Sequence, residues 1–242
     1  MSFLKENIEQ GFWKAVSQGN DGAVRMFLER IPEIRPNINN LNPHNDWSSL
    51  FVAVYEGHTK VVKTLLDWGA HIDQPCAFNE TPLQLAASMG HVEIMKLFLQ
   101  KKDTINLNGC NHRGRTALHG AVLKDTGITE LLIEAGADLN VKENSWGQTP
   151  LHQAVSFNNI NAVKALLQAG ADKTVRDNKN RTPLDMIEDF FKEEDKETLR
   201  QLFNEYPKKE NEGVHTKKVI SKQQNKPSFW RQLVRSFSYT KN

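Results

Sequence analysis

Cysteine is scarce in this sequence, which has only Cys76 and Cys110 among its 242 residues. The two lie far apart, and no second cysteine or histidine stands at metal-ligand spacing around either of them. This scarcity argues against a disulfide framework and against a zinc or redox pair. We interpret both residues as free thiols in loops, which fits a reducing compartment.

Long apolar runs are missing as well. The longest, at about residues 50–55, falls far short of a signal-peptide core or a membrane span. Hydrophobic residues make up 38% and charged residues 25% of the chain, and both fractions are typical of ordinary globular proteins. These features predict a soluble cytoplasmic protein, with the nucleus as the alternative location.

Charge of one sign does not dominate the whole chain, but it is unevenly distributed. The net charge is +2, yet residues 206–242 hold nine Lys or Arg against two Glu, a net charge of +7. Residues 1–205 therefore carry −5. An acidic body with a basic tail predicts separate roles for the two parts.

Internal repetition is what the sequence does contain. The first landmark is Thr-Pro-Leu or a variant of it, and successive copies are 33, 35, 33 and 33 residues apart. The copies begin at Ser48, Thr81, Thr116, Thr149 and Thr182. A second landmark, Leu-Leu followed closely by Gly-Ala, lies at residues 65–70, 131–137 and 166–171. Such a period indicates stacked units, each too small to bury a core alone.

The period and both landmarks resemble the ankyrin repeat, over roughly residues 10–204. The resemblance implies an all-α solenoid of about six helix-turn-helix repeats with β-hairpin fingers. Residues 1–46 would form a divergent or capping first repeat and a linker, and residues 47–205 five further repeats. Residues 206–242 would be a disordered basic tail.

The chemistry of individual residues agrees with this resemblance. Thr81 and Thr149 are predicted N-caps, because each precedes a proline at the first helical position. Gly136 and Gly170 stand where a helix must end in a left-handed conformation. In the fourth unit one residue is missing between the helices, and we place extra length in the preceding finger, around residues 108–110. A locally altered turn is expected there, without a break in the solenoid.

Eight histidines raise the question of metal binding or catalysis. His58 and His91 occupy the turn between helices, and His119 and His152 follow the Thr-x-Leu segment. The family uses histidine at both places for hydrogen bonds to the local backbone. No phosphate-binding loop and no nucleophile elbow occurs. We therefore predict no catalytic residues, no metal and no cofactor, and a protein that is not an enzyme.

In ankyrin folds the fingers and inner helices line a concave face that usually contacts the partner. The corresponding positions here carry many large apolar and basic side chains, which are typical of interface centres. The predicted partner-binding residues are Trp47, Tyr55, Phe78, Glu80, Met89, Arg113, Arg115, Trp146, Gln148, Phe157, Lys179 and Arg181. Alternatively, some of them fold back and seal the solenoid. The few basic residues on an acidic body argue against a nucleic-acid groove.

The tail is polar and Lys-rich until a short amphipathic segment at residues 228–237. Its apolar residues recur at helical spacing, with basic residues on the neighbouring face. The predicted tail-binding residues are Phe229, Trp230, Leu233, Arg235 and Phe237. A membrane surface, a second protein and the solenoid itself are the three candidate partners.

Three functional hypotheses follow from these patterns. The first is a protein-binding scaffold or adaptor with one partner on the concave face. The second is a substrate-recruiting subunit of a ubiquitin ligase, which would need the tail to bind ligase machinery. The third is a small enzyme that uses histidine or aspartate residues outside the repeat pattern.

Overall fold

The computed structural model describes residues 2–29, 37–42, 46–190 and 193–206. The chain divides into two units, residues 1–208 and residues 209–242, and all described residues belong to the first. The predictions for the amphipathic tail segment, from Phe229 to Phe237, therefore lie outside the described residues.

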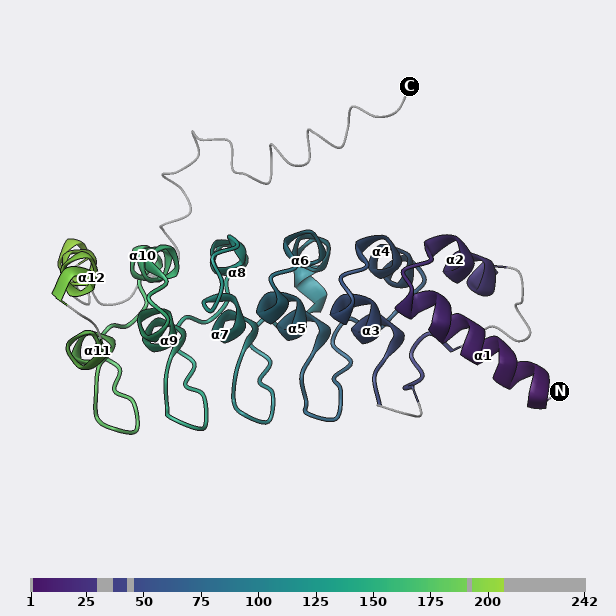
Figure 1. The fold of residues 1–242 in the computed structure, drawn as a ribbon, viewed down its shortest axis with the longest axis horizontal. Coiled ribbons are helices and arrows are strands. Elements are labelled where there is room, and N and C mark those ends of the chain that lie inside the picture. The colour runs from purple at the N-terminus through teal and green to yellow at the C-terminus, as the bar shows by residue number, and fades with distance from the viewer. Residues whose placement is uncertain (1, 30–36, 43–45, 191–192, 207–242) are drawn as a thin grey trace, which may run out of the picture. The chain divides into compact units, whose positions relative to one another are not determined.

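The described residues form helix pairs connected by fingers, which confirms the predicted all-α ankyrin solenoid. Figure 1 shows α3, α5, α7, α9 and α11 in one row beside the fingers, and we call these the inner helices. The helices are α1 (Ser2–Ser17), α2 (Asp21–Glu29), α3 (Ser49–Tyr55), α4 (Thr59–Asp67), α5 (Pro82–Met89), α6 (Val92–Leu99), α7 (Ala117–Ala121), α8 (Ile128–Ala135), α9 (Pro150–Ser156), α10 (Ile160–Ala169), α11 (Pro183–Phe190) and α12 (Glu193–Glu205). None of the described helices is long and apolar enough to cross a membrane.

The predicted helix ends are present. The Thr81 hydroxyl accepts a hydrogen bond from the backbone N–H of Gln84 (3.3 Å), and Thr149 caps α9 in the same way. Helices α8 and α10 end at Gly136 and Gly170, whose φ angles of 93° and 89° are left-handed. Because only glycine adopts this conformation at little cost, these two positions direct the chain from the helix into the next finger.

Stacking of neighbouring repeats buries the core. Phe98 of α6, Leu132 of α8 and Leu166 of α10 are all fully buried, although each helix is too short to be stable alone. Burial of one such side chain contributes about 1.5–3 kcal/mol to stability. The fold therefore depends on contacts between adjacent repeats more than on any single helix.

Hydrogen bonds across the repeats join the bases of the fingers. The Asn108 side-chain oxygen accepts from the backbone N–H of Asp138 (2.8 Å), and Asn140 accepts from that of Asp172 (2.8 Å). The same bond occurs between Asn39 and His71 and between Asp73 and Asn106. These bonds fix the spacing of successive fingers.

The fourth unit departs from the others, as the sequence predicted. Its inner helix α7 has five residues, and the turn after it passes through the left-handed Gly127 before α8 begins. We expected the extra length at residues 108–110, but it lies earlier in the chain. It forms a 3-10 helix, η1 (Lys102–Thr104), because α6 ends at Gln100 in a right-handed conformation, without the glycine that ends α8 and α10.

The fingers are tight turns and not the β-hairpins that the sequence predicted. No β-strand is assigned in the described ranges, and the only bridge there joins Leu41 to Ser48. Each later finger is closed by a backbone hydrogen bond, such as the one from Asp177 N to Arg181 O (2.9 Å). A short turn of this kind presents its central side chains to solvent.

Candidate partner-binding surface

Four neighbouring fingers present an exposed side chain from the same position of the repeat. Phe78, Arg113, Trp146 and Lys179 each stand three residues before the threonine that precedes an inner helix. We call these four residues the fingertip row. All are exposed, and the exposed fractions of Phe78 and Trp146, 72% and 54%, are large for aromatic side chains.

Backbone hydrogen bonds hold the fingertip row in place. The carbonyl oxygens of its first three residues accept from the backbone N–H groups of His112, Asn144 and Asn178, over 3.2, 2.8 and 2.8 Å. Each bond joins one finger to the next. The exposed side chains therefore project from a backbone that is fixed before any partner binds, which lowers the entropic cost of binding.

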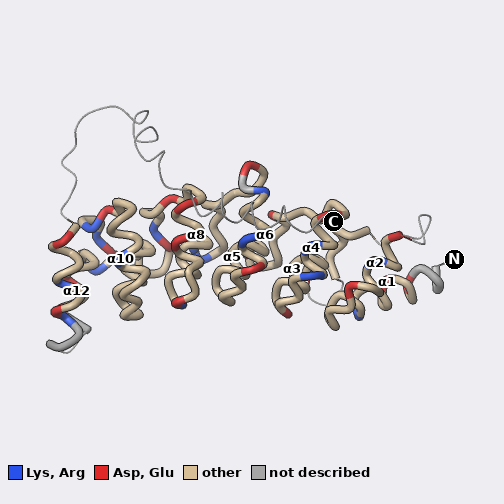
Figure 2. Tube along the Cα trace, turned by 90° about the horizontal axis from the view of Figure 1, so that it is seen from above, with Lys and Arg blue, Asp and Glu red and all other residues tan. Residues whose placement is uncertain are grey.

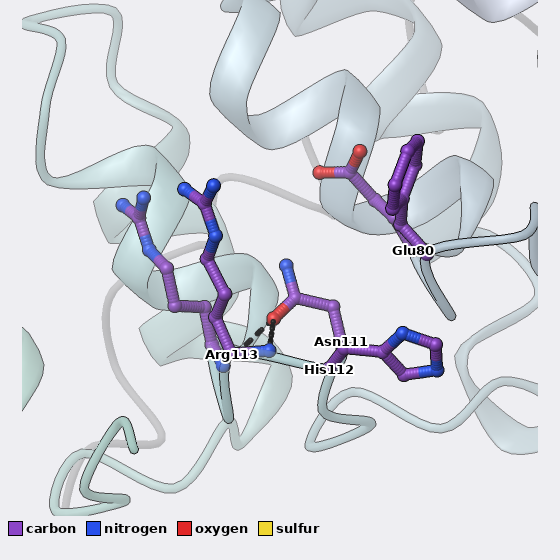
Figure 3. Close-up of a pocket in the computed structure, with 6 residues that line it drawn as sticks. Glu80, Asn111, His112 and Arg113 are labelled. Atoms are coloured by element: carbon purple, nitrogen blue, oxygen red, sulfur yellow. Dashed lines mark hydrogen bonds between the residues drawn. The ribbon is translucent and has the colours of Figure 1, made fainter. Parts of the chain in front are cut away.

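A cleft of about 310 Å³ opens between the first two fingers of the row. Figure 3 shows Glu80 and Arg113 on opposite sides of it, with Asn111 between them. The Asn111 side-chain oxygen accepts from the backbone N–H groups of Arg113 (3.0 Å) and Arg115 (3.1 Å) and shapes the turn. The residues lining the cleft are Phe78, Glu80, Asn111, His112, Arg113 and Arg115.

The charges in this cleft are poorly neutralised. Arg115 donates to the backbone oxygen of His119 (3.1 Å) and to Gln153 (3.3 Å), and burial lowers the pKa of its guanidinium. Burial also raises the pKa of the Glu80 carboxyl. Among the described residues, neither Arg113 nor Glu80 forms an ion pair, so both charges remain available to a partner.

The acidic groups of the next two fingers are buried instead. Glu143 is 4% exposed and accepts three backbone N–H bonds, which outweigh the effect of burial and lower its pKa. Asp177 is 5% exposed, and its ion pair with Arg181 (2.8 Å) and its backbone bonds also outweigh burial and lower its pKa. The exposed charges of the fingertip row are therefore positive, at Arg113 and Lys179.

The rest of the described chain shows a different distribution of charge. Acidic and basic residues are interspersed along the helices, rather than gathered into one basic stripe (Figure 2). Nucleic-acid-binding proteins usually carry a continuous basic patch. Within the described ranges, no group of three His, Cys, Asp or Glu side chains could hold a metal ion.

Other predicted binding residues lie at the ends of the inner helices. Tyr55 of α3, Met89 of α5 and Phe157 after α9 are 45%, 39% and 62% exposed. Gln148 directs its amide towards the Met186 sulfur (4.0 Å). Leu184 of α11 was not among the predicted residues, although it is 41% exposed; its counterparts Leu118 of α7 and Leu151 of α9 are fully buried, so its place in the repeat gave no signal of exposure.

Trp47 differs from the other finger aromatics, because it folds back onto its own repeat. Its ring lies 5.0 Å from that of Phe51 and 5.1 Å from that of Tyr55, measured between centroids, and it is only half-buried. This geometry matches the alternative in which some aromatics seal the solenoid.

The variant Trp47→Ala should therefore lose stability. We expect a fall of about 2 kcal/mol in the free energy of unfolding, because two aromatic contacts and much of a large buried surface disappear. Trp146→Ala is the matched control and should change stability by less than about 0.5 kcal/mol, since its ring is largely exposed. Urea unfolding followed by circular dichroism measures both; equal losses would contradict this assignment.

Of the four histidines predicted to bond to the backbone, three form such a hydrogen bond. The Nε2 atoms of His119 and His152 bond to the carbonyl oxygens of Gln148 (3.2 Å) and Arg181 (3.1 Å) in the following finger. His58 Nε2 bonds to the backbone oxygen of Ser17 (3.0 Å). His91 Nε2 is buried and has no hydrogen-bond partner among the described residues.

Comparison with known proteins gives a consistent result. The family described as "Ankyrin repeats (3 copies)" matches residues 73–143 and 124–187, and the family "Ankyrin repeat" matches residues 45–77. The chain is 32% identical to Target of rapamycin complex 2 subunit AVO2 of Saccharomyces cerevisiae, over 73% of this chain and 42% of the relative. It is 37% identical to Putative ankyrin repeat protein FPV031 of Fowlpox virus, over 57% of this chain and 42% of the relative.

A third relative is the Nuclear factor NF-kappa-B p105 subunit of Gallus gallus. The identity is 33% over 66% of this chain but only 17% of the relative. The matches to these three proteins span less than half of each relative's length. The repeats are thus what this chain shares with them.

Proposed function

The chain belongs to the ankyrin-repeat family, and from that premise we propose that it is a protein-interaction scaffold or adaptor whose concave face binds a partner. The observation that carries the proposal is the placement of exposed apolar side chains. Of the eight large hydrophobic side chains exposed in the described residues, five are at predicted partner-binding positions. They are Tyr55, Phe78, Met89, Trp146 and Phe157.

We further propose that the protein acts by binding and catalyses no reaction, that it works in the cytoplasm, and that its partner is a protein. The similarity to a subunit of target of rapamycin complex 2 supports a role within a protein assembly. It does not identify the assembly to which this chain would belong.

Affinity capture with the full chain as bait tests the proposal. The double variant Phe78→Ala/Trp146→Ala should lose at least one specifically captured protein, because aromatic side chains dominate the binding energy of interfaces. Met26→Ala removes an exposed apolar side chain of α2, far in the sequence from both Phe78 and Trp146, and should keep the same captured proteins. An unchanged set of captured proteins in the folded double variant would count against binding on this face.

The ubiquitin-ligase alternative depends on residues 228–242, which lie outside the described residues. No observation on the described repeats favours it. The membrane and second-protein roles of the tail likewise remain the sequence-based predictions stated above.

A further inference from the structure

The fingertip row has a regular chemical order, which runs aromatic, cation, aromatic, cation from Phe78 to Lys179. Lys179 Nζ lies 5.2 Å from the centroid of the Trp146 ring, so the last two members of the row are in contact. Such a cation over a ring presents charge and apolar surface at the same place. The row therefore offers alternating sites for apolar and negatively charged groups.

The spacing of the row fits an extended polypeptide. Packed helices stand roughly 8–10 Å apart, and the fingers follow the inner helices that they precede. An extended chain advances by about 3.3 Å per residue. Successive members of the row are therefore about three residues apart along a peptide that lies across the fingers.

The charges of the row favour carboxylates carried on a protein segment. Arg113 and Lys179 form no ion pair with a described acidic residue, and the acids of the last two fingers, Glu143 and Asp177, are buried. Glu80 faces Arg113 across the cleft (Figure 3) and would repel a dense array of phosphates. A nucleic-acid backbone or an anionic bilayer is continuously negative, whereas a peptide can place its charges at the cations alone.

We propose that the fingertip row binds an extended segment of another protein in which apolar and acidic side chains alternate at every third residue. The apolar side chains would contact Phe78 and Trp146, and the carboxylates would pair with Arg113 and Lys179. This inference rests on the proposed function, because it specifies the chemistry of a partner on the same face.

Fluorescence anisotropy with the purified full chain tests this inference. The probe is a labelled synthetic peptide of about twelve residues, with leucine and glutamate alternating at every third position and serine or glycine between them. A second peptide has the same composition but places the leucines and glutamates at every second position. A third replaces the glutamates with lysines.

The spaced acidic peptide should bind at least about tenfold more tightly than the other two. The double variant Arg113→Glu/Lys179→Glu should weaken its binding by about tenfold or more and should prefer the lysine peptide. Lys164→Glu reverses an exposed charge on the outer helix α10 and should leave binding unchanged. Added salt should weaken the interaction, since the charges are exposed.

Equal binding of the two acidic peptides, or no effect of the double charge reversal, would overturn the inference. So would tighter, reversal-sensitive binding of a single-stranded oligonucleotide or of a phosphatidylserine vesicle. If the peptides fail while Phe78→Ala/Trp146→Ala still abolishes capture of a protein, only the acidic-segment inference is lost. If both experiments fail, the proposed binding face is wrong as well.

Discussion

Lowering the pH from 7 to 5 is expected to reduce the free energy of unfolding by on the order of 2 kcal/mol through His119 alone. The His119 side chain is fully buried, and burial lowers its pKa to about 4 from an ordinary value near 6.5. Its Nδ1 accepts from the backbone N–H of Thr116 (3.1 Å), so a proton there would break the cap of α7.

The direction of this effect follows from proton binding. Between about pH 4 and pH 6.5 the unfolded chain binds a proton at this histidine and the folded chain does not. The stabilising contribution is therefore complete above the unfolded pKa and is lost as the pH falls. Burial lowers the pKa of His152 as well, so this second histidine adds to the loss in the same direction.

The chain itself supplies the control for this prediction. Gln84 occupies the same repeat position in α5, where its Oε1 accepts from Thr81 N (2.8 Å) and its Nε2 donates to Arg115 O (2.7 Å). The double variant His119→Gln/His152→Gln should therefore fold and lose most of its acid sensitivity between pH 7 and pH 5. Urea unfolding at several pH values measures the slope; an unchanged slope would place the sensitivity elsewhere.

The variant Gly120→Ala is expected to lower the free energy of unfolding by about 1–3 kcal/mol. A Cβ atom on Gly120 would lie 3.1 Å from the backbone nitrogen and 3.2 Å from the Cα atom of Ser88 in α5. Backbone atoms cannot move aside as a flexible side chain can. The third and fourth repeats would therefore separate slightly, and their shared core would loosen.

A second helical glycine provides the matched control. Gly22 of α2 is exposed, and a Cβ there would meet only the Asn20 side chain at 3.7 Å. Gly22→Ala should stabilise the fold by up to about 1 kcal/mol, through helix propensity. Thermal or urea unfolding of both variants gives the comparison; a stabilising Gly120→Ala would show that the two inner helices can move apart at little cost.

Much of the fold could be predicted because its signals are local. The N-cap of Thr81 with Pro82 and the left-handed ends at Gly136 and Gly170 each depend on a few adjacent residues. The extra residues of η1 were misplaced for the same reason. The Asn and Gly at residues 108 and 109 resemble a turn insertion, whereas nothing local marks Gln100 as a helix end.

The site was less predictable because it depends on contacts that form only when each finger folds and packs against its helix. Whether Trp47 points to solvent or onto Tyr55 is decided by packing against α3, which the finger sequence does not contain. The burial of Glu143 beside the exposed Trp146 follows from backbone N–H groups that only the folded turn brings together. The sequence thus predicts which residues occupy the fingers, and the fold decides which of their side chains are exposed.

Photo-crosslinking tests the central claim, that a partner protein lies against the fingers, most directly. A photoreactive amino acid would replace Phe78 at the fingertip, or Lys164 on the outer helix α10 as a control. The account predicts a crosslinked partner protein from position 78 and none from position 164. A partner captured from position 164 alone would place the interface on the outer helices and contradict the account.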